Sequence, residues 1–237
     1  MSDVAAHPEW TVEGPVAQRH LLVVLPHPDD ESFSSGGTIA MHHDAGVPVT
    51  YLCGTYGDMG RNMGKPFFAN RESLRDVRER ELRAACEILG CDVQFLGLRD
   101  KTIEFEDPDA IAIQIRGVIE ALDADLVIGF YPGHGVHPDH DALGEALRLA
   151  VQGMDEEIRP RHWAVAVGNR DEVEADLGVA DVRVDIRAFG DRKRAALEAH
   201  ATQTKAMFER MAQQAPGDEA MRLRMEESRR TERFYTL

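Results

Sequence analysis

Apolar residues fall along the chain in two alternating patterns, short continuous runs and longer stretches with helical spacing. Residues 20–26 (HLLVVLP) form an uninterrupted apolar run, which is typical of a strand that a parallel sheet buries on both faces. Residues 33–45 then place apolar side chains at helical spacing, and residues 47–53 (VPVTYLC) form a second β-rich run. A strand, a helix and a strand in close succession indicate a βαβ unit of a parallel sheet.

The same alternation continues along the chain. Further strands are predicted over 93–98, 125–131, 162–168 and 182–186, and further helices over 71–89, 108–122, 142–151, 189–214 and 218–232. The sequence has no internal repeat and no linker that would require a second domain. It therefore predicts one α/β domain over residues 19–237, with a Rossmann-like, mostly parallel sheet flanked by helices, after a loosely held lead-in over residues 1–18.

Composition narrows the classes of function. The 237 residues include 27 Lys and Arg against 42 Asp and Glu, which gives a formal net charge of −15. This charge repels phosphate backbones and anionic lipids, so we expect no nucleic-acid partner and no membrane. No apolar run approaches the roughly 20 residues that span a bilayer. Because residues 1–18 do not resemble a signal peptide and the three cysteines offer no disulfide framework, we expect a cytoplasmic protein.

Side chains that can bind a metal gather in two loops, each directly after a buried strand. Residues 26–31 (PHPDDE) follow the first strand, and residues 133–140 (GHGVHPDH) follow the strand predicted over 125–131. The carboxyl ends of parallel strands carry the functional groups of open sheets. The two loops therefore converge if their strands are neighbours.

Three ligands of mixed histidine and carboxylate type, with one position left open, form the donor set of a catalytic zinc. His27 and Asp30 are three residues apart in a turn, and a third ligand from the second loop would complete the set. Asp29 would then be free to act as a base toward an attacking water. An Asp-rich turn can instead cap a helix, but two such loops, each after a buried strand, favour a metal.

These loops resemble the two signatures of the PIG-L/LmbE family of zinc-dependent N-acetylglucosamine deacetylases, which are HPDDE near the N-terminus and HxxH further on. The resemblance extends to the late helix that carries Lys193, His200 and Gln203. Within the family, residues 57–73 (GDMGRNMGKPFFANRES) and 130–142 (FYPGHGVHPDHDA) are most similar to the second type of bacillithiol biosynthesis deacetylase.

The resemblance implies a role for each of several residues of this chain. The metal ligands that it implies, with Zn²⁺ as the ion and Fe²⁺ as an alternative, are His27, Asp30 and His140. The catalytic residues that it implies are Asp29 as general base, His137 as the group that stabilises or protonates the tetrahedral intermediate, and Asp139 as the carboxylate that orients this histidine. The residues that it implies in contact with the sugar or an acidic aglycone are Ser34, Arg61 and Asp100.

Two of these assignments carry alternatives. Some relatives have a tyrosine where this chain has Gly135, so the proton for the departing amine comes from either Asp29 or His137. Arg61 would bind a substrate carboxylate through two parallel hydrogen bonds, or it is a solvated arginine in a loop.

The expected function is metal-dependent hydrolysis of the acetamide of an N-acetylglucosaminyl compound, with the N-acetylglucosaminyl malate of bacillithiol biosynthesis as the leading substrate. One alternative is an amidase of bacillithiol S-conjugates, and another is a metal- or sugar-binding protein without turnover. The resemblance also implies a homo-oligomer, either a trimer or a hexamer. The sequence has no phosphate-binding loop of the Walker type, so a phosphotransferase is the least favoured of these functions.

Overall fold

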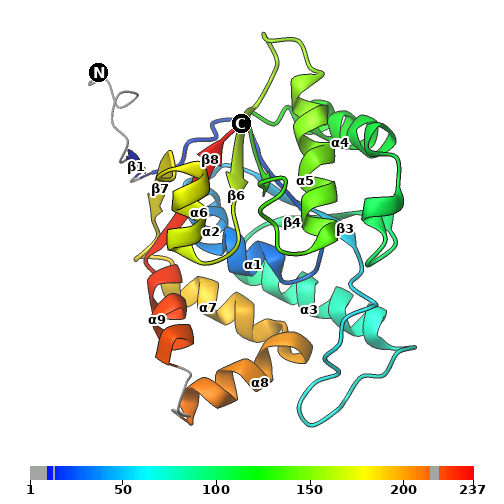
Figure 1. Cartoon of the computed structure of the whole chain (residues 1–237), viewed down its shortest axis with the longest axis vertical. Coiled ribbons are helices and arrows are strands. Elements are labelled where there is room, and N and C mark those ends of the chain that lie inside the picture. Colours follow the sequence, from blue (N-terminus) through cyan, green and yellow to red (C-terminus); the bar gives the residue numbers. More distant parts are fainter. Residues whose placement is uncertain (1–9, 13, 214–218) are drawn as a thin grey trace.

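The fold is built on a single twisted sheet (Figure 1). The computed structural model describes residues 10–12, 14–213 and 219–237. Within these residues the sheet has eight strands in the order β1-β7-β8-β6-β5-β2-β3-β4. The strands are β1 (Trp10–Val12), β2 (Leu21–Leu25), β3 (Val49–Thr55), β4 (Asp92–Leu98), β5 (Leu126–Phe130), β6 (Arg161–Val165), β7 (Val182–Asp185) and β8 (Thr231–Thr236).

Every pair of neighbouring strands is parallel except the two pairs that include β8. The predicted α/β fold with a mostly parallel sheet is therefore confirmed. Strand β2 lies in the interior of the sheet, and all five of its residues are buried. Burial of each such aliphatic side chain stabilises the fold by roughly 1.5–3 kcal/mol, which explains the uninterrupted apolar run in the sequence.

Helices cover both faces of the sheet (Figure 1). Leu21 and Val23 of β2 join a core with α2, α3 and α7, whereas Leu22 and Val24 join a core with α4 and α5 on the opposite face. The helices are α1 (Asp30–Ser34), α2 (Gly36–Asp44), α3 (Leu74–Leu89), α4 (Pro108–Leu122), α5 (Pro138–Gln152), α6 (Arg170–Leu177), α7 (Gly190–Ala199), α8 (Ala201–Ala212) and α9 (Glu219–Ser228), with a 3-10 turn η2 (Ile103–Phe105).

The helix predicted over 33–45 is two helices that meet at Ser35. The carboxylate of Glu232, from the far end of the chain, accepts the backbone N–H of Gly37 at 2.9 Å and that of Thr38 at 2.8 Å. These N–H groups belong to the first turn of α2, where a helix has no internal acceptors. A residue nearly 200 positions away in the sequence therefore caps the second helix, and local periodicity could not predict it.

The C-terminal prediction was wrong in part. Helix α9 ends at Ser228, and residues 231–236, partly expected as helix, form β8. The long helix predicted over 189–214 divides at His200, and its last residue lies outside the described part of the chain, as does residue 218. The lead-in expected over 1–18 lies partly outside it as well, and residues 10–12 pair with β7. None of the described helices is long and apolar enough to cross a membrane.

Candidate active site

The two loops with metal-binding side chains lie at one edge of the sheet. Strands β2 and β5 pair in parallel, with Leu21 opposite Leu126, so the loops that follow them are neighbours. The chain leaves β2 toward β3 on one side, whereas β5 flanks β2 on the other side. This reversal of strand order opens a crevice at the carboxyl ends of the strands, where open α/β sheets bind their ligands.

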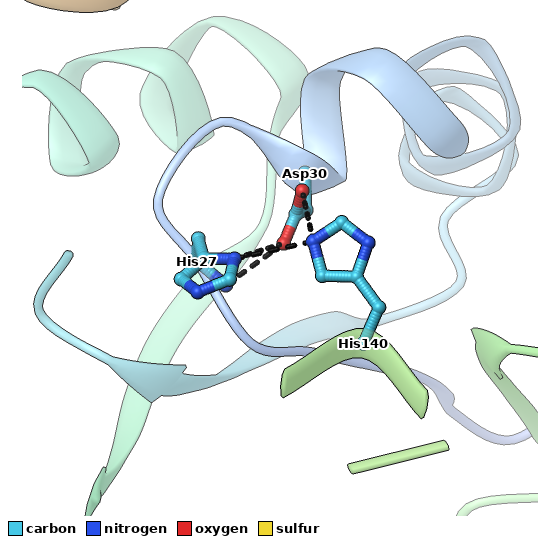
Figure 2. A group of neighbouring side chains, drawn as sticks. All are labelled: His27, Asp30 and His140. Atoms are coloured by element: carbon cyan, nitrogen blue, oxygen red, sulfur yellow. Dashed lines mark hydrogen bonds and ion pairs between the residues drawn. The ribbon is translucent and has the colours of Figure 1, made fainter. Parts of the chain in front are cut away.

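Three predicted metal ligands meet at this crevice, where Figure 2 shows them pointing toward one another. His27 Nδ1 lies 3.3 Å from Asp30 Oδ2 and 3.2 Å from His140 Nε2. His140 Nε2 lies 3.5 Å from Asp30 Oδ1. Ligands that surround a tetrahedral zinc at roughly 2.0–2.1 Å are about 3.3 Å from one another. The spacing of these three side chains therefore fits a zinc-sized ion.

The outer nitrogens of both rings fix which nitrogen faces inward. His140 Nδ1 lies 2.9 Å from the carbonyl of Gly135, which can only accept, so Nδ1 carries the proton. His27 Nε2 lies 3.2 Å from Asp139 and 3.3 Å from Asp100 and donates in the same way. Two unprotonated ring nitrogens and a carboxylate then face one point. Such a donor set repels itself unless a cation lies between its members, and histidines held in this way are typical metal ligands.

The carboxylates around His27 favour positive charge at this position. Burial lowers the pKa of the His27 imidazole, but hydrogen bonds to Asp100, Asp139 and Asp30 outweigh it and set the pKa well above 6.5. His140 shows the opposite result, because burial lowers its pKa and the nearby Asp30 offsets only part of the shift. The carboxylates thus make His27 the more basic of the two histidines, which favours binding of a cation at its inner nitrogen.

Asp29, the predicted base, has an unusual backbone. Its φ of 109° is in the left-handed region, which a non-glycine residue occupies only when its surroundings impose it. Glu31 accepts the Asp29 N–H at 3.0 Å, and the Arg78 guanidinium lies 3.2 Å from Asp29 Oδ2. Burial raises the pKa of Asp29 to about 6, although Arg78 lowers it. A carboxyl group with such a pKa is suited to accept a proton near neutral pH.

His137 and Asp139 begin helix α5, which starts four residues earlier than the predicted helix over 142–151. His137 Nδ1 accepts the N–H of Asp139 at 3.1 Å, and Pro138 occupies the first position of the helix, where its missing N–H does no harm. With Nδ1 as an acceptor, the ring proton lies on Nε2, which has no hydrogen-bond partner among the described residues and can donate. Its ring centre lies 5.0 Å from that of His27.

The carboxylate of Asp139, which the sequence predicts to orient His137, has its hydrogen bonds in this structure with other groups. The carboxylate accepts the N–H groups of Lys101 at 2.7 Å and Ile103 at 3.1 Å, and it contacts His27 Nε2. The loop after β4 thus supplies two donors that hold Asp139 against the other histidine. In this structure Asp139 orients His27.

The three predicted substrate residues lie in different environments. Ser34 lines a cavity of about 490 Å³ together with Asp30, His140 and Phe130. Asp100 is buried, binding His27 and accepting the N–H of Met59 at 2.6 Å. Arg61 is exposed in the loop between β3 and α3 and has no hydrogen bond or ion pair within the described part of the chain.

Two charged residues of the site were missed by the sequence reasoning. Arg78 is 4% exposed and holds Asp29, although helix α3 was read only for its apolar positions. Its spacing of four residues from both Leu74 and Leu82 places it on the apolar face, which is the signal that could have identified it. Glu31 is fully buried, and its carboxylate lies 2.7 Å from Nε2 of His200. His200, between α7 and α8, therefore holds the turn over residues 26–31 in place.

Known proteins are similar to the part of this chain that carries the site residues. The family model described as PIG-L, GlcNAc-PI de-N-acetylase, matches residues 22–151. A Bacillus cereus protein named as a probable N-acetyl-alpha-D-glucosaminyl L-malate deacetylase 2 is 52% identical over 193 residues, which cover 81% of this chain and 87% of that protein.

Two solved structures share the fold at low identity. N,N'-diacetylchitobiose deacetylase from Pyrococcus horikoshii superposes with a TM-score of 0.72 at 20% identity, covering 94% of this chain and 84% of that one. GalB, a 4-carboxy-2-hydroxymuconate hydratase from Pseudomonas putida, gives 0.71 at 22% identity, covering 93% and 96%. Fold likeness alone therefore does not separate a deacetylase from a hydratase. The sequence relationship does, and this chain belongs to the PIG-L family of GlcNAc-PI de-N-acetylases.

Proposed function

We propose that this chain is a zinc-dependent deacetylase that hydrolyses the acetamide of N-acetylglucosaminyl malate. The observation that carries the proposal is the convergence of His27, Asp30 and His140 on one point, with the strained Asp29 beside them. The substrate class is supported by the family to which the chain belongs and by the name of the 52% identical Bacillus cereus protein.

In this proposal His27, Asp30 and His140 hold the ion. Bound zinc would supply Lewis-acid polarisation of the amide carbonyl and make a water more acidic. Asp139 and Asp100 keep the inner nitrogen of His27 free for this purpose by accepting from its outer nitrogen. An ion held by two neutral imidazoles and one carboxylate retains a positive charge, which suits the polarisation of an amide.

Asp29 removes the proton from the attacking water. An amide is a weak electrophile, so a charge-stabilising donor has to act together with the base. His137 Nε2 carries a proton and is free to hydrogen-bond the developing oxyanion. The departing amine takes its proton either from Asp29, which has received one from the water, or from His137.

The cavity of about 490 Å³ beside Asp30 and His140 has room for a sugar ring. Its wall combines apolar side chains with Ser34 and the ion pair between Arg170 and Glu174. Such a mixture of donors and acceptors suits sugar hydroxyls. Arg61, whose guanidinium has no partner among the described residues, is proposed to bind the carboxylates of the malate group.

The experiment is amine release by zinc-loaded protein from three substrates in parallel, namely N-acetylglucosaminyl malate, plain N-acetylglucosamine and a bacillithiol S-conjugate. Faster release from the malate compound than from the other two supports the proposal. Faster cleavage of the S-conjugate would favour the amidase instead. Zinc binding without release from any of the three would indicate a binding protein.

Three further properties are part of the proposal. We propose that residues 19–237 form the catalytic domain, that the protein works in the cytoplasm, and that it assembles as a trimer or hexamer. Light scattering at micromolar concentration tests the assembly, and a monomer would contradict it.

A further inference from the structure

Arg78 is a buried cation on helix α3 that joins two segments of the active-site region. We infer that Arg78 is a positioning residue, which sets the carboxylate of Asp29 for proton transfer and ties it to the loop over residues 56–73. This inference rests on the proposed function. It goes beyond that function by assigning a role to a residue that is neither a ligand nor in contact with the substrate.

The guanidinium divides its donors between the two segments. One terminal nitrogen donates to the carbonyl of Pro28 and lies 3.2 Å from Asp29 Oδ2. The other donates to the carbonyl of Gly57 at 2.8 Å. The planar fork of an arginine serves the two segments with separate nitrogens, whereas a lysine has a single nitrogen on a flexible stem.

The turn needs this cation for a physical reason. The Asp29 carboxylate is only 17% exposed, and a buried carboxylate without a partner is costly. Glu31 fixes the backbone N–H of Asp29, whereas Arg78 fixes one oxygen of its side chain. With one oxygen held, the other is left for the proton. A shift of about 1 Å in a reacting group costs on the order of 100-fold in rate.

The loop approaches Arg78 more closely than a side chain would allow. Gly57 has a φ of +65°, and a Cβ at this position would lie 2.3 Å from Arg78 Nη1. A glycine is therefore required both by the backbone and by space. Four residues further on, the same loop carries Arg61. Arg78 thus joins the proposed base and the start of the proposed recognition loop.

The test is a double-mutant cycle between Arg78 and Asp29. Arg78→Gln is expected to lower kcat by about 10–100-fold, with KM and zinc content unchanged, and Arg78→Lys is expected to lose less. In an Asp29→Asn background the same Arg78→Gln change is expected to cost less than about threefold, because no base remains to be positioned. Arg83→Gln changes an exposed arginine on the same helix that pairs with Glu79; it is the matched control and should keep wild-type kcat.

Equal losses of kcat in both backgrounds would show that Arg78 only maintains the fold, and a rise in KM with kcat unchanged would show that it binds substrate; either result overturns the inference. If Arg78→Gln fails to fold, judged by its thermal midpoint, Gly57→Ala provides the same test by displacing the guanidinium. Absence of turnover in the wild-type protein overturns the proposed function and the inference with it. Wild-type turnover with fully active Arg78 variants overturns the inference alone.

Discussion

The turn over residues 26–31 and the loop over residues 56–73 both follow buried strands, yet the fold holds them very differently. In the turn, Asp30 and Glu31 are buried and every functional side chain has partners. In the loop, Phe67 is 85% exposed and Arg61 extends into solvent without a partner in the described chain. In the proposed function, the tightly held segment carries the chemistry and the exposed segment carries recognition.

This difference follows from what each segment has to do. A base and metal ligands must be fixed before the substrate arrives, since loss of geometry lowers the rate directly. A recognition loop can tolerate freedom and gains its order from the ligand. Changes in the turn are therefore expected to lower kcat or remove the metal, and a change at Arg61, the proposed recognition residue of the loop, is expected to raise KM.

Loss of a ligand should give the largest effect. His140→Ala removes one of three donors, so zinc content should fall from one per chain to near zero and amine release should become undetectable. Zinc analysis and the release assay measure this. His134→Ala, in the same loop but paired with Asp176 at 3.2 Å, is the control and should keep its metal. Full turnover of a metal-free His140→Ala protein would contradict the zinc centre.

Removal of the base should come next. Asp29→Asn keeps the size of the side chain but not its basicity, so kcat should fall by roughly 10²–10⁴-fold while zinc is retained. Steady-state kinetics and metal analysis on the same sample test this. If kcat is retained, Asp29 is not the base and has only a structural role in the turn.

The loop should respond in KM. Arg61→Ala is expected to raise KM for the malate compound by about 10–100-fold, which corresponds to a lost charge-assisted hydrogen bond. KM for plain N-acetylglucosamine, which lacks the carboxylates, should not change. Lys65→Ala, which removes a positive charge from the same loop where it pairs with Glu209 at 3.0 Å, is the matched control. Equal KM changes for both substrates would argue against a malate clamp.

A buried histidine outside both segments gives the smallest effect and a contrast with His27. His162 lies on β6, and burial, reinforced by the positive charge of Arg148, lowers its pKa from 6.5 to about 4. Between these pH values the unfolded chain binds a proton that the folded chain does not. The free energy of unfolding therefore falls as the pH falls, by up to about 3 kcal/mol.

Replacing His162 with Leu should remove this contribution. Urea unfolding at pH 7 and pH 4.5 measures it, and the loss of stability on acidification should be smaller by about 2 kcal/mol in His162→Leu. An equal loss in both proteins would show that this histidine is protonated in the folded state. His27 is also buried, but its hydrogen bonds to Asp100, Asp139 and Asp30 together outweigh burial and raise its pKa, so the neighbouring groups as well as burial set the pKa of a histidine here.

The sheet and the position of the metal-binding loops could be predicted because they depend on short segments. A continuous apolar run such as 21–25 requires burial on both faces, and the groups that follow it must then lie at the crevice. The caps and breaks could not be predicted. Ser35 interrupts a helix because Glu232 binds the N–H groups of Gly37 and Thr38 from a distant strand, and no local pattern contains that information.

The candidate site divides in the same way. The residues with metal-binding side chains were evident from their type and spacing, and the structure brings His27, Asp30 and His140 within contact of one another. The supporting groups were not evident. The contacts of the Asp139 carboxylate with His27 depend on Lys101 and Ile103, which hold it from another loop, and Arg78 was hidden among the apolar positions of a helix.

The central claim is that three side chains of the two loops hold the ion that makes this fold a deacetylase. The most direct measurement is amine release from N-acetylglucosaminyl malate by protein stripped of metal and then titrated with Zn²⁺, with Fe²⁺ in a parallel titration. We predict no release by the stripped protein and a rise that saturates at one ion per chain. Full release by the stripped protein, or saturation at one ion in His140→Ala, would contradict the claim.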